Sequence, residues 1–234
     1  MKKYIGTKTV KAMPMTMGEA YERKLLKEGV KPSQGEASKA GYLVKYEDGY
    51  QSWSPAEVFE KAYRVAETPL DRMKIEYGET KARYLKGDAF LKEAFKSLTY
   101  LPKVLFSAQN ETQREYTYLL QDRIDEMSGR TVRPVNYDFG TAIKFLKAGG
   151  AIRRAGWNGK GLFVVKQVPA HIKADIIPNM QSLPQIAKDI IMARNDAHIS
   201  YANQMLIIHP DGRADSWVPS SSDVFAEDWE LVTE

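Results

Sequence analysis

DFGTAIKFLKAGGAIRRAGWNGKG, residues 138–161, carries the strongest structural signals in this chain. Asp138 is a typical helix N-cap residue, and apolar residues follow it at helical spacing as far as Gly149-Gly150, where a helix is expected to end. The residues on both sides of Asn158-Gly159 are strand-like, and this dipeptide is typical of a two-residue hairpin turn. The segment therefore predicts a helix followed by an antiparallel β-hairpin.

The rest of residues 135–234 shows further helical and strand-like patterns. In chain order, we expect a helix over 184–197 with Ile186, Ile190 and Ile191 buried, a hairpin over 205–218 that turns at Asp211-Gly212, a short helix capped by Ser220 and Asp223, and a strand over 229–232. Together these elements predict a C-terminal α+β domain built on an antiparallel sheet.

Residues 1–66 are expected to form a small α+β unit. The alternating run 42–53 is interrupted by Glu47-Asp48-Gly49, which predicts a hairpin with an Asp-Gly turn. Ser54-Pro55-Ala56-Glu57 then supplies an N-cap residue, a first-turn proline and a glutamate at the third helical position, so a helix is expected through about Ala66. Residues 29–40 contain turn formers without periodicity and predict a mobile loop.

Residues 68–129 are expected to form a helical hairpin. The first helix has an apolar seam at three- and four-residue spacing, which Thr80 and Gly87 weaken. The pattern breaks after Tyr100-Leu101-Pro102, and a second helix is expected to end near Ser128-Gly129. Because one hairpin offers little core, its apolar stripe is expected to pack on a neighbouring domain or another subunit, while ordinary internal packing is an equal alternative.

The composition indicates a soluble globular protein of the α+β class. Of 234 residues, 43% are hydrophobic and 27% are charged, and no apolar run approaches the length of a membrane span. The absence of cysteine excludes disulfides, thiolate metal sites and a cysteine nucleophile, and fits a reducing cytoplasm. Residues 135–234 have a net charge of −1, so residues 1–134 carry +5, and their interspersed acids favour a solvated surface over a nucleic-acid site.

Signatures of catalysis are missing from the sequence. The three histidines lack zinc-ligand spacing, and there is no phosphate-binding loop motif. A triad of Ser220, His209 and Asp223 is conceivable, but the serine lies in no nucleophile elbow, and helix capping already explains Ser220 and Asp223. We therefore expect no catalytic residue, no metal and no cofactor.

The placement of tryptophan suggests a binding site. Trp157 lies beside the predicted hairpin turn with Asn158 next to it and Arg153 and Arg154 behind it, and Trp217 ends the second hairpin. Indole faces can stack on a nucleotide base while guanidinium groups meet its phosphates. The arginines alternate across a strand, so we expect one of them to face a ligand. The alternative is that the tryptophans fill a small core; this is favoured for Trp229 and equally weighted for the other two.

Two motifs in residues 135–234 resemble those of a phage protein family. The motifs are AGWNGKG at 155–161 and SxSDxxAxDW at 220–229, and the residues just before the second motif, 216–220, also match. The segment resembles the phage Thoeris anti-defence type two sponges, which sequester the cyclic ADP-ribose signal made by bacterial TIR enzymes. Some relatives also hold cyclic oligonucleotides, and the family pocket lies between subunits of a tetramer. Residues 1–66 and 70–128 are similar to segments of uncharacterised phage and prophage proteins.

The resemblance implies a non-enzymatic protein in the cytoplasm of the infected bacterial host. It would bind glycocyclic ADP-ribose or a cyclic oligonucleotide as a homo-oligomer, without membrane or nucleic-acid partners. The resemblance makes Trp157 and Trp217 candidate stacking residues, Asn158 and Asp223 candidate polar readers, and Ser220 and Ser222 candidate hydroxyl donors. Arg153 and Arg154 are added on physical grounds as phosphate partners. The alternative is a phage structural or protein-interaction module without a small-molecule ligand.

Overall fold

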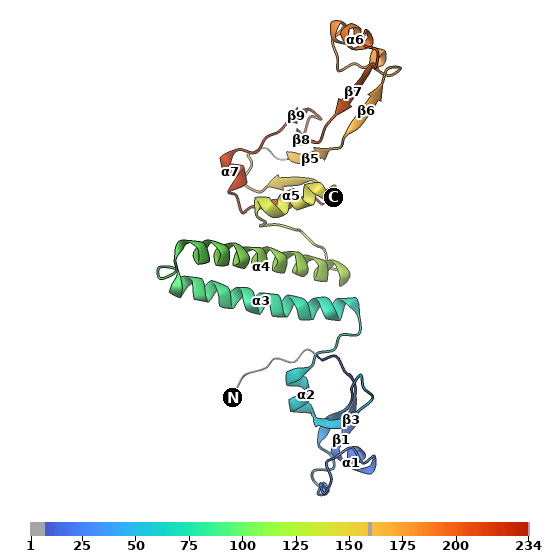
Figure 1. Ribbon diagram of the computed structural model, residues 1–234, viewed down its shortest axis with the longest axis vertical. Helices are drawn as coiled ribbons and strands as arrows, with labels where there is room; N and C mark the ends of the chain where they lie inside the picture. The colour runs from blue at the N-terminus through green and yellow to red at the C-terminus, as the bar shows by residue number, and fades with distance from the viewer. Residues whose placement is uncertain (1–7, 159–160, 234) are drawn as a thin grey trace. The chain divides into compact units, whose positions relative to one another are not determined.

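The protein has a mixed α+β fold, as the sequence predicts (Figure 1). The computed structural model describes residues 8–158 and 161–233. Contacts divide the chain into two units, residues 1–72 and 73–234, which are described separately below. The division into 1–66, 68–129 and 135–234 stays a prediction. Within the described residues, no helix is both long and apolar enough to cross a membrane.

The N-terminal unit is a three-stranded antiparallel sheet with two short helices. Its strands are β1 (Lys11–Thr16), β2 (Ala40–Lys45) and β3 (Gln51–Pro55), in the order β1-β2-β3. The predicted hairpin is confirmed as β2 and β3, with register from Gly41 opposite Pro55 to Lys45 opposite Gln51. Strand β1 and helix α1 (Met17–Glu22) were not predicted, although Thr16 and Glu19 form a capping box at the start of α1.

Helix α2 (Ala56–Ala62) is shorter than predicted. It begins after Pro55, which provides no side-chain cap, and ends at Tyr63, whose backbone is extended, so the expectation of a helix through Ala66 was wrong. Aromatic side chains pack the end of α2 on the sheet. The rings of Tyr42 and Phe59 stack at 4.4 Å, and those of Phe59 and Tyr63 stack at 4.8 Å, which holds the end of α2 against the sheet.

Helices α3 (Pro69–Ala94) and α4 (Tyr100–Met127) lie side by side as a hairpin (Figure 1). Gly87 is buried, and the side chain of Asn110 from α4 packs directly on it. A Cβ added at Gly87 would overlap Asn110 Oδ1. The apparent weak point of the seam is therefore a place of close approach. Pro102 lies in the first turn of α4 and does not precede it; helix N-termini tolerate proline because their N–H groups have no intrahelical acceptor.

The C-terminal domain is a five-stranded antiparallel sheet packed against α5 (Phe139–Lys147). The strand order is β10-β4-β5-β8-β9. The strands are β4 (Ile152–Arg154), β5 (Phe163–Gln167), β8 (Gln204–Ile208), β9 (Ala214–Ser216) and β10 (Trp229–Leu231), and α7 (Ser221–Val224) precedes the last of them. The hairpin over 205–218, the capped helix after Asp138 and the closing strand are present, and Tyr137, Ile152, Val164 and Trp229 are fully buried in the core. Strands β4 and β5 also pair, but β4 ends at Arg154 and β5 begins at Phe163, so the expected two-residue connection at Asn158-Gly159 was wrong; Gly159 itself lies outside the described residues. Trp229 is thus a core residue, as favoured from the sequence.

A second hairpin, β6 (Ala170–Lys173) with β7 (His198–Tyr201), was not predicted. It carries the short 3-10 helix η1 (Ile177–Asn179) and helix α6 (Gln185–Met192). The expected burial of the α6 isoleucines was wrong: Ile186 is 67% exposed, Ile190 is 56% exposed and Ile191 is half-buried. The reason is that α6 packs mainly on η1, so only one side of the helix is covered.

Helix α4 also packs directly on the C-terminal domain. The Tyr137 hydroxyl donates a 2.6 Å hydrogen bond to Asp122, and the Asp138 backbone N–H donates a 3.1 Å bond to Glu115. Leu119 packs against the domain core between these two carboxylates. Burial raises the pKa of both Glu115 and Asp122. One side of α4 thus packs on the core of the five-stranded sheet within the same unit.

Candidate functional site

Three tryptophans of the C-terminal domain form a cluster. The ring of Trp157 lies 6.0 Å from Trp217 and 5.6 Å from Trp229, and Trp217 lies 6.1 Å from Trp229, each pair edge to face. Trp229 is fully buried, whereas Trp157 and Trp217 are half-buried against the core. The outer two indoles therefore keep exposed surface and rest on a fixed aromatic base.

Helix α7 supports this cluster through its N-terminal cap. Ser220 and Asp223 form a capping box: the Asp223 N–H donates to Ser220 Oγ at 3.2 Å, and Asp223 Oδ2 accepts from the Ser220 N–H and hydroxyl at 3.0 and 2.7 Å. The hydroxyls of Ser220 and Ser222 lie 2.8 Å apart. The Asp223 carbonyl accepts the indole N–H of Trp229 at 3.0 Å, so α7 is tied to the core.

The other Asp223 oxygen, Oδ1, faces the cluster. It accepts the indole N–H of Trp157 at 3.2 Å and an Arg154 Nη1–H at 3.0 Å. Burial alone would raise the pKa of Asp223, but hydrogen bonds from Ser220, Arg154 and Trp157 outweigh it and lower the pKa. Both oxygens of Asp223 are thus occupied by groups of the same chain, and the carboxylate remains charged at neutral pH.

Arg154 joins the α7 cap to the end of the sheet. Its Nε donates to Asp228 Oδ1 at 2.8 Å, while Nη1 also reaches the Ser222 carbonyl at 3.3 Å. Burial would raise the pKa of Asp228, but bonds from Arg154 and from the Gly156 N–H lower it. The cluster therefore holds one guanidinium between two carboxylates, a local net charge of −1.

Most of the candidate residues come together in this cluster: Arg154, Trp157, Trp217, Ser220, Ser222 and Asp223. Arg153 does not, because it lies on the other face of β4 and pairs with Glu230 at 2.7 Å. The strand alternation thus turns Arg154, not Arg153, toward the tryptophans. Asn158 is exposed beside the turn, and Gly159 and Lys160 of the AGWNGKG motif lie outside the described residues.

Sequence reasoning missed two features of this site. Asp228 was not a candidate, although its place in the SxSDxxAxDW motif beside Trp229 was a signal for it. The second feature is an exposed apolar rim: Val218 is 80% exposed and Phe225 is 84% exposed, on the two segments that flank α7. Large apolar side chains in such positions are typical of interaction sites when they occur together.

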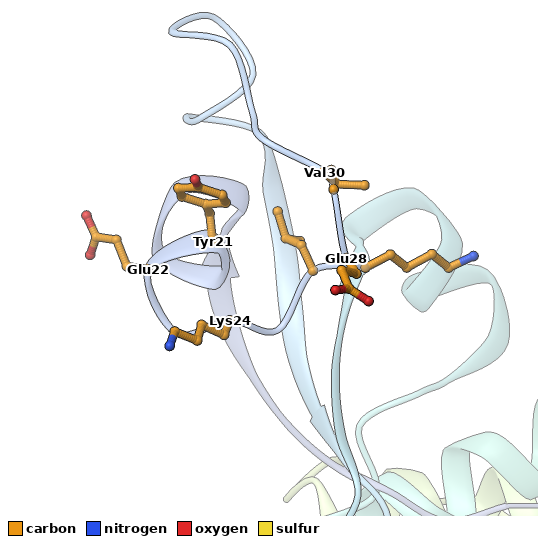
Figure 2. A pocket seen from close by; sticks show the side chains of 8 residues that line it. Tyr21, Glu22, Lys24, Glu28 and Val30 are labelled. Carbon is orange, nitrogen blue, oxygen red and sulfur yellow. The ribbon is translucent and has the colours of Figure 1, made fainter.

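Elsewhere, the described residues offer no comparable site. No group of three or more metal-ligating side chains occurs among them. His209 pairs with Asp215 at 3.0 Å and not with Ser220, so the conceivable triad is not assembled. A hollow of about 540 Å³ in the N-terminal unit is lined by the end of α1 and the loop after it. In Figure 2, Glu22 and Lys24 point away from Val30, and this mixed lining indicates no ligand class.

The fold is a small α+β domain in which a capped helix supports a cluster of three tryptophans. Residues 137–232 match the family described as Thoeris anti-defense 2-like domain, and residues 67–126 match the family called Sequestin. The Thoeris anti-defense 2 protein of Bacillus phage SP01 is 32% identical over 98 residues, which cover 41% of this chain and 93% of that protein. The chain therefore belongs to the Thoeris anti-defense 2-like family, and this membership supports a phage anti-defence role.

Proposed function

We propose that the C-terminal domain binds a cyclic nucleotide-derived immune signal and sequesters it intact. The observation that carries this proposal is the fixed pair of half-buried indoles, Trp157 and Trp217, at 6.0 Å. Indole faces stack on nucleobases, a contact that contributes about 1–3 kcal/mol per base in other proteins. Family membership supports a Thoeris anti-defence role. We propose glycocyclic ADP-ribose as the signal, with cyclic oligonucleotides as further ligands, because the resemblance of the sequence motifs to the phage sponges implies them.

The chemistry of the cluster favours binding over cleavage. Asp223, its central carboxylate, has a lowered pKa and two occupied oxygens, so it is a poor general base. The Ser220 hydroxyl is engaged with Asp223 and Ser222 and has no histidine beside it among the described residues. Among the described residues, the exposed Asn158 amide is a polar group that can meet a ligand. We therefore propose a sponge and not an enzyme.

The exposed rim supports a homo-oligomeric site. Val218 and Phe225 flank α7 and stand mostly in solvent, where they could be covered by a second copy of the domain. A partner copy would also bury the outer faces of Trp157 and Trp217 around a ligand. We propose that the protein acts in this form, a tetramer on the family pattern, in the cytoplasm of the infected host.

A binding titration tests this proposal. Isothermal calorimetry with glycocyclic ADP-ribose should show binding to the full chain, weakened roughly tenfold or more by Trp217→Ala, since one stacking contact is lost. Tyr50→Ala is a matched control, because Tyr50 is an exposed aromatic residue of the N-terminal unit. Equal affinity of Trp217→Ala and wild type, or no binding by wild type, would contradict the proposal.

A structural or protein-interaction module remains the second candidate. It is favoured by the α4 residues Tyr100, Leu101 and Leu105, which are all exposed apolar side chains near the turn of the helical hairpin. On this alternative the tryptophans only fill the core. Trp217→Ala would then lower the free energy of unfolding by about 3–5 kcal/mol, with no ligand to lose.

A further inference from the structure

Of the two carboxylates that flank Arg154, one bonds the Trp157 side chain and the other bonds the backbone of the residue before it. Asp223 Oδ1 accepts the indole N–H at 3.2 Å, which fixes the rotation of the ring. Asp228 Oδ2 accepts the Gly156 N–H at 2.7 Å, which fixes the backbone immediately before the tryptophan. Arg154 is bonded to both carboxylates, through Nη1 and Nε, and so sets their separation.

The backbone at Gly156 is fitted to this arrangement. A Cβ at this position would lie 2.8 Å from Asp228 Oδ2, so a larger residue would push the carboxylate away from the main chain. The Asp228 carbonyl also accepts the Ala155 N–H at 3.0 Å. Asp228 thus holds two successive N–H groups of the turn that leads to Trp157, one with its side chain and one with its main chain.

From this geometry we propose that Arg154 and Asp228 are positioning residues for Trp157 and not contacts to the ligand phosphates. The proposal rests on the proposed ligand site and names two groups that set its shape. Arg154 is mostly buried, and its charge is already matched by Asp223 and Asp228. A planar guanidinium with several fixed donors can bridge two carboxylates, whereas a lysine ammonium cannot reproduce that fork.

The two roles predict different results for Arg154→Lys. A phosphate contact depends on charge, so lysine would keep much of the affinity, and Arg154→Gln would lose it together with part of its salt dependence. A positioning residue depends on shape. Arg154→Lys and Arg154→Gln should then weaken binding of glycocyclic ADP-ribose by a similar factor, roughly tenfold or more, with the salt dependence of the Kd unchanged.

The indole N–H signals of the four tryptophans test positioning without any ligand. In a 15N–1H spectrum of the full chain, the Trp157 signal should shift and exchange faster with solvent in Arg154→Lys, Arg154→Gln and Asp228→Asn. The Trp53 N–H donates to the Met15 carbonyl in the N-terminal unit, so its signal should stay unchanged. Arg153→Gln is the matched control, because Arg153 pairs with Glu230 on the opposite strand face and should affect neither the Trp157 signal nor binding.

An unmoved Trp157 signal in the Arg154 variants would overturn the proposal, as would Arg154→Lys binding as tightly as wild type. If the Arg154 variants do not fold, Asp228→Asn decides the question by the same spectrum, since it keeps Arg154 and removes only the carboxylate charge. Failure of wild-type protein to bind the signal would refute the proposed function. The ligand-free spectrum would still support or overturn the positioning role.

Discussion

Tyr137 and Asp122 join the C-terminal domain to helix α4 through a 2.6 Å hydrogen bond, with the phenol ring fully buried. Tyr137→Phe removes the donor and leaves the half-buried carboxylate of Asp122 without it. We expect the free energy of unfolding to fall by about 1–3 kcal/mol, because a desolvated acceptor loses its partner.

Chemical denaturation of the full chain measures this change. Tyr116→Phe is the control, since the Tyr116 hydroxyl also bonds a carboxylate, Glu76, but at the surface of the hairpin. It should change the free energy of unfolding by less than about 1 kcal/mol. Equal effects of the two substitutions on the free energy of unfolding would contradict a stabilising role for the contact between α4 and the domain.

The pH dependence of stability should reveal Glu115. Burial raises its pKa in the folded protein above the ordinary value of 4.5, so the folded state holds its proton more tightly than the unfolded chain. Its contribution to stability is therefore fully present below about pH 4.5 and is lost as pH rises through the higher folded pKa. Glu115→Gln keeps an acceptor for the Asp138 N–H but removes the titration.

Denaturation curves of wild type and Glu115→Gln across this pH range test the assignment. The variant should gain stability relative to wild type as pH rises above 4.5, and the difference should then level off. Asp228→Asn should show the opposite trend. The pKa of Asp228 is lowered in the folded protein, so its contribution is present above the unfolded pKa and is lost as pH falls. A pH-independent difference for Glu115→Gln would be inconsistent with a buried titrating carboxyl.

Gly87→Ala tests the close approach of α3 and α4. The added methyl group would overlap Asn110 Oδ1, and Asn110 is buried, so the Asn110 side chain or the helices must shift. We expect a loss of about 1–3 kcal/mol in the free energy of unfolding, as for other overpacked sites. Gly78→Ala is the matched control on the same helix: nothing lies within 4 Å of its Cβ position, so it should stabilise α3 by up to about 1 kcal/mol. Similar changes at both positions would rule out the close approach.

Local patterns predicted elements whose signals lie within a few residues. The Asp138 cap, the two turns at Asp48-Gly49 and Asp211-Gly212, and the Ser220 capping box all give the observed structures. Predictions of burial failed where contacts between distant parts of the chain decide which side chains are covered. Ile186 and Ile190 form an apolar face that nothing in the described chain covers, and the sequence pattern of an amphipathic helix is the same whether or not a partner is present.

For the candidate site, the sequence predicted which tryptophans and which helix cap are involved. It did not predict what the charged residues around them bind. Strand alternation shows that Arg153 and Arg154 face opposite sides, yet only the pairing of β4 with β10 shows which side holds Asp228. Asp223 was expected to read a ligand, whereas in the structure its oxygens bind Ser220, Arg154 and Trp157. Such assignments depend on distances across more than sixty residues of chain.

We propose that the tryptophan cluster holds a cyclic nucleotide signal without altering it. The most direct measurement is mass spectrometry of what the protein releases: incubate it with glycocyclic ADP-ribose, remove free ligand, heat-denature the protein and analyse the supernatant. We expect recovery of intact ligand from wild type and little from Trp157→Ala. Recovery of a cleaved product, or of no ligand at all, would contradict it.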